Sequence, residues 1–225
     1  MSKKGKQEKF VEIGTLPNVF QNHEVLTNNL VNSEGKKVNM QGHWHDFFGN
    51  DNPITVELAC GKGEYAVGLA RMYPERNFIG MDLKGNRLWR GATAAIQEGL
   101  TNVAFIRSQI DFISYYFAPG ELSEIWITFA DPQLEKPRKR LTSNFFMDWY
   151  RKVLKPGGLI HLKTDSPELY DFTMKRVIEE KLKLQFAHDN IYTLPEQMPE
   201  WTIKTYYEQM HLEKGLTIKY LRFEL

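Results

Sequence analysis

Short apolar runs alternate with longer amphipathic stretches from residue 54 onward, and this alternation limits the chain to few folds. The apolar runs, which we expect to form strands, are 54–60, 77–83, 102–108, 124–130, 159–164, 183–190 and 216–225. The amphipathic stretches, which we expect to form helices, are 65–72, 87–99, 143–154, 165–180 and 204–214. Strands that alternate with helices form βαβ units, so we predict an α/β fold with a mostly parallel sheet that helices cover on both faces.

The composition is that of a globular protein, with 42% hydrophobic and 25% charged residues, so wholesale disorder is excluded. No run approaches the roughly 18 apolar residues that a membrane span needs, and we therefore expect no membrane association. The first residues are polar and basic, without the apolar segment of a secretory signal. With a single cysteine, Cys60, a reducing cytoplasmic location is expected.

The net charge is only +1, so binding to a polyanion would require a local basic patch. Two patches are candidates: Lys3, Lys4, Lys6 and Lys9 at the start of the chain, and Lys136, Arg138, Lys139 and Arg140 in the middle. Residues 1–20 lack helical or strand periodicity, and we expect them to form a basic, flexible arm. The middle patch could equally be a solvated surface.

Ligands of open parallel sheets bind beyond the carboxyl ends of the strands. There, Gly61 and Gly63 form part of a G-x-G-x-x-A motif, which suits close approach of the backbone to a ligand. Asp82 follows about 20 residues later, where an acid can hold ribose hydroxyls or cap the next helix. These features suit a nicotinamide dinucleotide or S-adenosylmethionine (SAM), and a plain glycine turn also remains open.

Three further acids favour SAM over a hydride carrier. Glu57 lies inside the first strand, where a charge is costly unless it has a partner such as a cationic amine or sulfonium. Asp131 and Asp165 follow the fourth and fifth strands, and carboxylates at the mouth of the site suit a cationic donor. Asp131 could also be a turn residue and Asp165 a helix cap.

Several segments together resemble the tRNA (guanine-N7-)-methyltransferase family of the TrmB type, from about residue 20 to the end. They are ELACGKGEY, MDLKGNRLWRGA, SEIWITFADPQ with PRKRLTS, LKPGGLIHLKTDS and TYYEQ. The resemblance implies that residues 21–225 form a single class I SAM-dependent methyltransferase domain. Its Rossmann-like sheet would have seven strands in the order 3-2-1-4-5-7-6, with the last strand antiparallel.

The same resemblance implies transfer of a methyl group from SAM to N7 of guanine 46, in the variable loop of tRNA. It assigns the SAM site to Glu57, Gly61, Gly63, Asp82, Gln109 and Asp131, with Asp131 catalytic. It assigns the tRNA guanine site to Lys136, Asp165, Thr205, Tyr206, Tyr207 and Glu208. The chain departs from the family pattern at Ala59, where glycine is usual, at Gln109, and in a shorter loop after Asp131.

Guanine N7 already carries an in-plane lone pair, so no nucleophilic side chain is expected. The protein must position N7 in line with the methyl group and stabilise the charge that moves onto the purine. Tyr206, Tyr207 or Trp201 could stack a flipped base, although the tyrosines could also be ordinary packing residues. The basic loop would contact phosphates and fix the register of the RNA.

Other reactive side chains are expected to be structural. Cys60 follows an apolar strand without a nearby histidine, and His161 lies within a strand. His43 and His45 are too few for a metal centre, and we predict no metal. Two other functions remain as alternatives, an NAD-dependent oxidoreductase and a non-catalytic RNA-binding module. The sequence leaves open whether the protein is a monomer or a homodimer.

Overall fold

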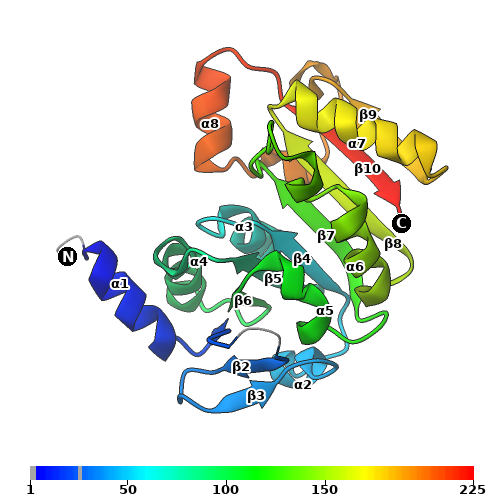
Figure 1. Ribbon diagram of the computed structural model, residues 1–225. Coiled ribbons are helices and arrows are strands. Elements are labelled where there is room, and N and C mark those ends of the chain that lie inside the picture. The colour runs from blue at the N-terminus through cyan, green and yellow to red at the C-terminus, as the bar shows by residue number, and fades with distance from the viewer. Residues whose placement is uncertain (1–3, 25–26) are drawn as a thin grey trace.

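A sheet of ten strands organises the computed structural model, which describes residues 4–24 and 27–225 (Figure 1). Seven of the strands correspond to those expected from the sequence. They are β4 (Ile54–Leu58), β5 (Asn77–Asp82), β6 (Val103–Arg107), β7 (Leu122–Thr128), β8 (Leu154–Thr164), β9 (Lys183–His188) and β10 (Lys219–Glu224). Their spatial order, β6-β5-β4-β7-β8-β10-β9, is the predicted order 3-2-1-4-5-7-6, and β10 runs antiparallel to both of its neighbours.

Three short strands that the sequence did not predict extend the β6 edge of the sheet. They are β1 (Val19–Gln21), β2 (Asn29–Val31) and β3 (Lys37–Asn39). β1 pairs in parallel with β6, which places Val19 opposite Phe105. The predicted count of seven strands was therefore too low.

The start of the chain is also more regular than expected. Residues 6–12 form helix α1 (Lys6–Glu12), and Ile13 behind it is fully buried. The carboxylate of Glu12 accepts a hydrogen bond from Trp89 Nε1 at 2.9 Å, which ties this segment to the rest of the fold. The expectation of an arm without regular structure is wrong for residues 4–20, and Lys3 lies outside the described residues.

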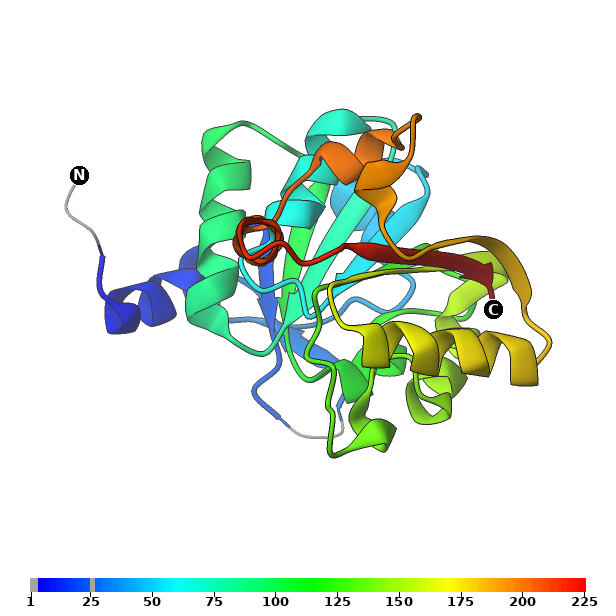
Figure 2. The same cartoon turned by 90° about the horizontal axis from the view of Figure 1, so that it is seen from above.

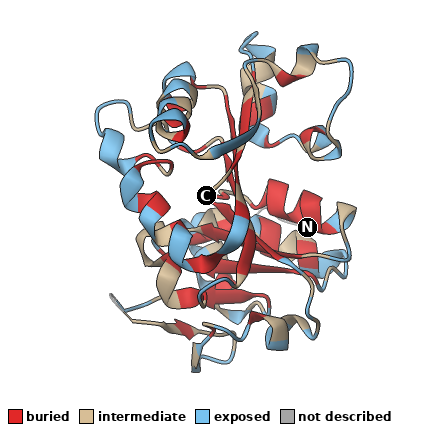
Figure 3. Ribbon diagram, turned by 90° about the vertical axis from the view of Figure 1, so that its right-hand side faces the viewer, coloured by how far each residue is buried: buried red, intermediate tan, exposed pale blue. Residues whose placement is uncertain are grey.

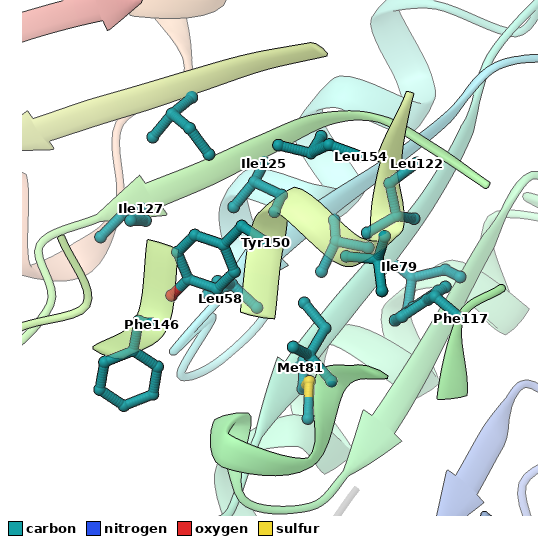
Figure 4. Packing of buried hydrophobic residues seen from close by; sticks show 14 of the residues in the cluster. Leu58, Ile79, Met81, Phe117, Leu122, Ile125, Ile127, Phe146, Tyr150 and Leu154 are labelled. Atoms are coloured by element: carbon teal, nitrogen blue, oxygen red, sulfur yellow. The ribbon is translucent and has the colours of Figure 1, made fainter. Parts of the chain in front are cut away.

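Helices cover both faces of the sheet (Figures 1 and 2). α3 (Glu64–Met72) and α4 (Gly85–Gln97) pack on one face, and α5 (Ile113–Tyr116), α6 (Asn144–Val153) and α7 (Pro167–Glu179) on the other. Because side chains alternate along a strand, Ile125 and Ile127 of β7 enter the core beside α6 (Figure 4), while Trp126 enters the core beside α3. The remaining helices are α2 (Trp44–Phe48) and α8 (Tyr206–Glu213), and single 3₁₀ turns cover 13–15, 110–112, 137–139, 191–193 and 199–202.

Local sequence explains where several of these elements begin. The hydroxyl of Ser166 caps α7 by accepting a hydrogen bond from the Leu169 N–H at 3.1 Å, and Pro167 follows in the first turn. By contrast, the KPGG segment at 155–158 lies within β8 rather than before it. There the pairing with β7 shifts register, and Gly157 adopts a φ of +73°.

Burial follows the layers, since the central strands and the inner faces of the helices are buried while the loops at their ends are exposed (Figure 3). Within 4–24 and 27–225, no helix combines the length and the apolar character needed to cross a bilayer.

Candidate active site

A cavity of about 330 Å³ opens where β4, β5 and β7 end. It brings together three of the acids selected from the sequence, Glu57, Asp82 and Asp131. Thr205 and Tyr207, from the start of α8, form its opposite wall. The three acids, which span 74 positions of the chain from 57 to 131, therefore meet in one site, as expected when parallel strands end at the same edge of a sheet.

Glu57 is the most deeply buried acid of the cavity, with only 2% of its surface exposed. Its carboxylate accepts hydrogen bonds from the backbone N–H of Ala66, at 2.9 Å, and from the Thr128 hydroxyl. Burial raises the pKa of Glu57 to about 8, although both hydrogen bonds act to lower it. A buried carboxyl in this state is suited to a cationic partner, because a positive charge beside it would restore its ionised form.

Asp82 links the glycine turn to α4. Its two carboxylate oxygens accept hydrogen bonds from the N–H groups of Gly61, at 2.9 Å, and Lys84, at 2.8 Å. Because Lys84 is the N-terminal cap residue of α4, Asp82 closes the turn before the helix rather than capping it. These bonds hold the carboxylate at the edge of the cavity.

A second cavity, also of about 330 Å³, continues from the first. The two cavities share Ala59 and Asp82, and the second also contains Gln109. Glu57 lines only the first of the two cavities and Gln109 only the second, so they lie at opposite ends of the joined site. This arrangement fits an elongated ligand that has a cationic end near Glu57, a ribose near Asp82 and a base near Gln109.

The two motif glycines have different surroundings. Gly61, with a φ of +56°, has open space where a Cβ would lie and faces the site. Gly63, with a φ of +69°, is pressed against Phe105, since a Cβ there would lie 2.5 Å from its ring. Gly63 lines a neighbouring groove instead, and its position is explained by packing.

Ala59 occupies a left-handed conformation, with a φ of +54°. Glycine, the usual family residue here, adopts this conformation without steric cost, whereas alanine does not. The departure from the family pattern therefore places backbone strain directly at the junction of the two cavities.

The loop after β7 presents Asp131 to solvent. Its Oδ1 accepts a hydrogen bond from the Gln133 N–H at 2.9 Å. Lys136 is exposed and lies outside the two cavities. Arg140, which we grouped with the exposed phosphate-binding side chains, is buried instead: its Nε donates to the Pro132 carbonyl at 2.9 Å, and its guanidinium lies 4.6 Å from the Phe172 ring centre.

Asp165 is not a helix cap, because Ser166 performs that role. Its Oδ1 lies 3.0 Å from Nδ1 of His211 on α8. His211 lines the first cavity, but no sequence pattern pointed to it, because it faces Asp165 only once α8 has packed against the end of β8.

The predicted guanine-binding stretch of α8 divides into exposed and buried residues. Tyr206 and Tyr207 are 52% and 36% exposed, and their rings meet edge-on. Glu208 is fully buried, with Oε1 2.8 Å from Lys163 Nζ, and also accepts a hydrogen bond from the Tyr192 hydroxyl. Glu208 therefore anchors the helix and offers no surface to a base, and the same holds for Trp201, which is 1% exposed.

The other reactive side chains have structural surroundings. Cys60 is buried, and burial raises the pKa of its thiol. His161 is buried too, stacked on Trp126 and hydrogen-bonded to the Tyr220 hydroxyl at 2.7 Å, as predicted for a core residue. His43 contacts Asp46 and His45 contacts the Asn52 carbonyl. In the described parts of the chain, no three His, Cys, Asp or Glu side chains are grouped to hold a metal ion.

Comparison with known proteins decides the family. Residues 51–221 match a family described as "Putative methyltransferase". The tRNA (guanine-N(7)-)-methyltransferase of Bacteroides thetaiotaomicron is 48% identical over 99% of this chain and 86% of its own length. The protein of the same name from Christiangramia forsetii is 46% identical over the whole of both chains. This chain belongs to the tRNA (guanine-N7-)-methyltransferase family.

Solved structures confirm the fold. The 16S rRNA methyltransferase KamB superimposes with a TM-score of 0.65 over 84% of this chain and 96% of its own, at 14% identity. The chain is thus a Rossmann-like methyltransferase, and the methyl donor of its family is SAM. The two joined cavities and the buried Glu57 fit such a cationic, elongated donor.

Proposed function

We propose that this chain transfers a methyl group from SAM to N7 of guanine 46, in the variable loop of tRNA. The observation that carries the proposal is the convergence of Glu57, Asp82 and Asp131 on one cavity whose outer wall is the exposed aromatic start of α8. The names of the relatives supply the reaction, and the family resemblance supplies position 46.

The cofactor is assigned to the joined cavities. Glu57 pairs with the cationic amino acid end of the donor, Asp82 accepts hydrogen bonds from the ribose, and Gln109 borders the base. When bound, SAM supplies an electrophilic methyl group. Gly61 leaves room for the ligand, whereas Gly63 contributes by holding α3 close to Phe105.

Asp131 and Asp165, at the opening of the cavity, bind the guanine. Because N7 needs no deprotonation, the protein contributes orientation and electrostatics. Asp131 and Asp165 accept hydrogen bonds from the N–H groups of the base and stabilise the positive charge that the purine gains. Tyr207, with Tyr206 beside it, offers a stacking surface.

The exposed side chains of the loop after Asp131, namely Lys136, Arg138 and Lys139, contact phosphates without reading the base sequence. Residues 21–225 form the methyltransferase domain, which acts as a monomer or homodimer in the cytoplasm. The segment before residue 21 joins that domain, because Ile13 and Val19 are buried in its core and β1 pairs with β6.

The test is methylation of unmodified tRNA by the purified protein with SAM, followed by mass spectrometry of the digested nucleosides. We expect 7-methylguanosine, and chemical cleavage of the strand at that base should place it at position 46. Asp131→Asn should lower kcat by at least about 100-fold, whereas Asp148→Asn, an exposed acid on α6, should not. Absence of 7-methylguanosine with the unaltered protein would overturn the proposal, and cleavage elsewhere would overturn position 46 alone.

A further inference from the structure

A groove of about 660 Å³ lies beside the cofactor site and has no role in the mechanism above. α3 and α4 form its two sides, and residues 203–204, just before α8, form part of its rim. Its floor is tight, because a Cβ on Gly91 would lie 2.7 Å from the Lys62 carbonyl oxygen. Backbone and small residues therefore hold α3 and α4 close together here, and longer side chains such as Arg90 and Lys204 line the rest of the groove.

The groove continues directly from the site of methyl transfer. Lys62 and Glu64 line both the groove and the cavity that holds Glu57 and Asp131. Tyr206 covers this junction, since its backbone N–H donates to Glu64 at 2.9 Å and the Lys62 ammonium lies 3.7 Å from its ring centre. A strand whose base enters the cavity would therefore pass over Tyr206 to reach the groove.

The charges along this path are mostly positive. Lys84, Arg87 and Arg90 follow one another at intervals of three residues, which aligns them along one side of α4. Lys84 and Arg87 border the cavity, and Arg90 borders the groove. No Asp or Glu occurs between Lys84 and Gln97.

The opposite rim of the groove adds Lys204. Arg90 and Lys204 have no ion-pair partner among the described residues, whereas Arg71, also on the groove, is held by Glu98. Two exposed cations without an ion-pair partner in the described parts of the chain therefore line the groove, and the Lys204 ammonium also lies 4.9 Å from the Tyr192 ring centre. This arrangement suits the evenly spaced negative charges of a nucleic acid backbone.

We propose that the groove between α3 and α4 binds the ribose-phosphate backbone of tRNA next to the methylated guanine, with Arg90 and Lys204 as its phosphate contacts. The proposal rests on the proposed function and adds a second phosphate track to the loop at 136–139. The strand leaves the cavity past Lys62 and Tyr206 and follows the basic side of α4. Lys84 and Arg87 extend the same positive potential to the mouth of the cavity.

The test uses Arg90→Gln, Lys204→Gln and the double variant in the full-length protein. Binding to unmodified tRNA is measured from about 50 to about 200 mM salt, because each lost phosphate contact on a single strand lowers the slope of log affinity against log salt by about 0.7. We expect the double variant to bind about tenfold more weakly at low salt, with a slope smaller by about 1.4. Affinity for SAM, kcat at saturating tRNA and the unfolding temperature should stay at the values of the unaltered protein.

The matched control is Lys152→Gln with Lys175→Gln, which removes two exposed lysines from α6 and α7 on the opposite face of the sheet. This variant should retain the original slope. If R90Q/K204Q binds tRNA with the original affinity and slope, or no more weakly than the control, the groove proposal is wrong while the proposed function stands. If the unaltered protein forms no 7-methylguanosine, both fall together.

Discussion

The imidazole of His211 lies 3.0 Å from the carboxylate of Asp165, although the two residues are 46 positions apart in the chain. Asp165 follows β8 and His211 lies in the last turn of α8. The contact holds Asp165, which we assign to the guanine site, against α8, the helix that carries Tyr206 and Tyr207. His211 is therefore a positioning residue for Asp165.

Replacing His211 should loosen Asp165 without affecting the fold. We expect His211→Ala to raise KM for tRNA by up to about fivefold, the cost of losing one partly exposed polar contact to a carboxylate. His211→Asn, which keeps an N–H donor, should recover part of the loss. Steady-state kinetics with tRNA varied at saturating SAM measures both. Equal KM values for H211A and the unaltered protein would contradict the positioning role.

The buried pair of Lys163 and Glu208 should matter for stability more than for chemistry. Both side chains are fully buried, so Lys163→Met leaves an unpaired carboxylate in the interior. We expect a loss of about 3–5 kcal/mol in the free energy of unfolding, measured by urea denaturation. The double variant K163M/E208L should lose much less, because it removes both charges. If K163M/E208L were as unstable as K163M, the unpaired carboxylate would not be the cause of the loss in K163M, and this prediction would be wrong.

Glu57 should make the stability of the ligand-free protein fall as the pH rises. Its pKa is raised from 4.5 to about 8 in the folded state, so the folded protein holds a proton that the unfolded chain releases between those values. Stability from this group is fully present below about pH 4.5 and is lost as the pH rises toward 8. Relative to Glu57→Gln, which does not titrate, the unaltered protein should lose up to a few kcal/mol across that window. Urea denaturation at pH 5, 6.5 and 8 tests this, and parallel curves for the two proteins would refute it.

Ala59→Gly should stabilise the protein. The substitution removes the strain of a left-handed alanine, about 1–2 kcal/mol, at the cost of a more flexible unfolded chain, so a net gain of about 0.5–1 kcal/mol is expected. Lys181, which has a φ of +54° just beyond α7 and far from the cavities, provides a matched site. Lys181→Gly should give a gain of similar size in thermal unfolding. A loss of stability in A59G alone would mean that the methyl group of Ala59 contributes more packing than strain.

The sequence predicted the central sheet because its strands carry their own evidence. Runs such as 54–60 and 124–130 are apolar enough to form buried strands in any α/β protein. The three-residue strands β1, β2 and β3 have too few side chains to show a period, and β1 is specified by its pairing with β6, more than 80 residues away. The KPGG segment was taken for a turn because Gly157 permits one, yet it lies within β8 as an irregularity between two residues that pair with β7, Leu154 and Leu159.

The same division applies to the site. Glu57, Asp82 and Asp131 could be selected because strand ends converge by topology alone. The surroundings of three other residues could not be predicted, because each depends on a partner far away in the sequence. Gly63 packs against Phe105, Arg140 lies over Phe172, and Glu208 pairs with Lys163. A sequence shows that a residue is charged or small, whereas only the packed fold shows whether its side chain is already paired with, or packed against, another residue.

The position of β10 has a consequence for biosynthesis. β9 is hydrogen-bonded to no strand of the described sheet except β10, and α8 lies in the connection between them. A nascent polypeptide that has not yet delivered residues 219–224 leaves β9 unpaired and α8 without its second tether. Because Tyr207 of α8 forms part of the cavity wall, we expect a polypeptide without paired residues 219–224 to have an incomplete site.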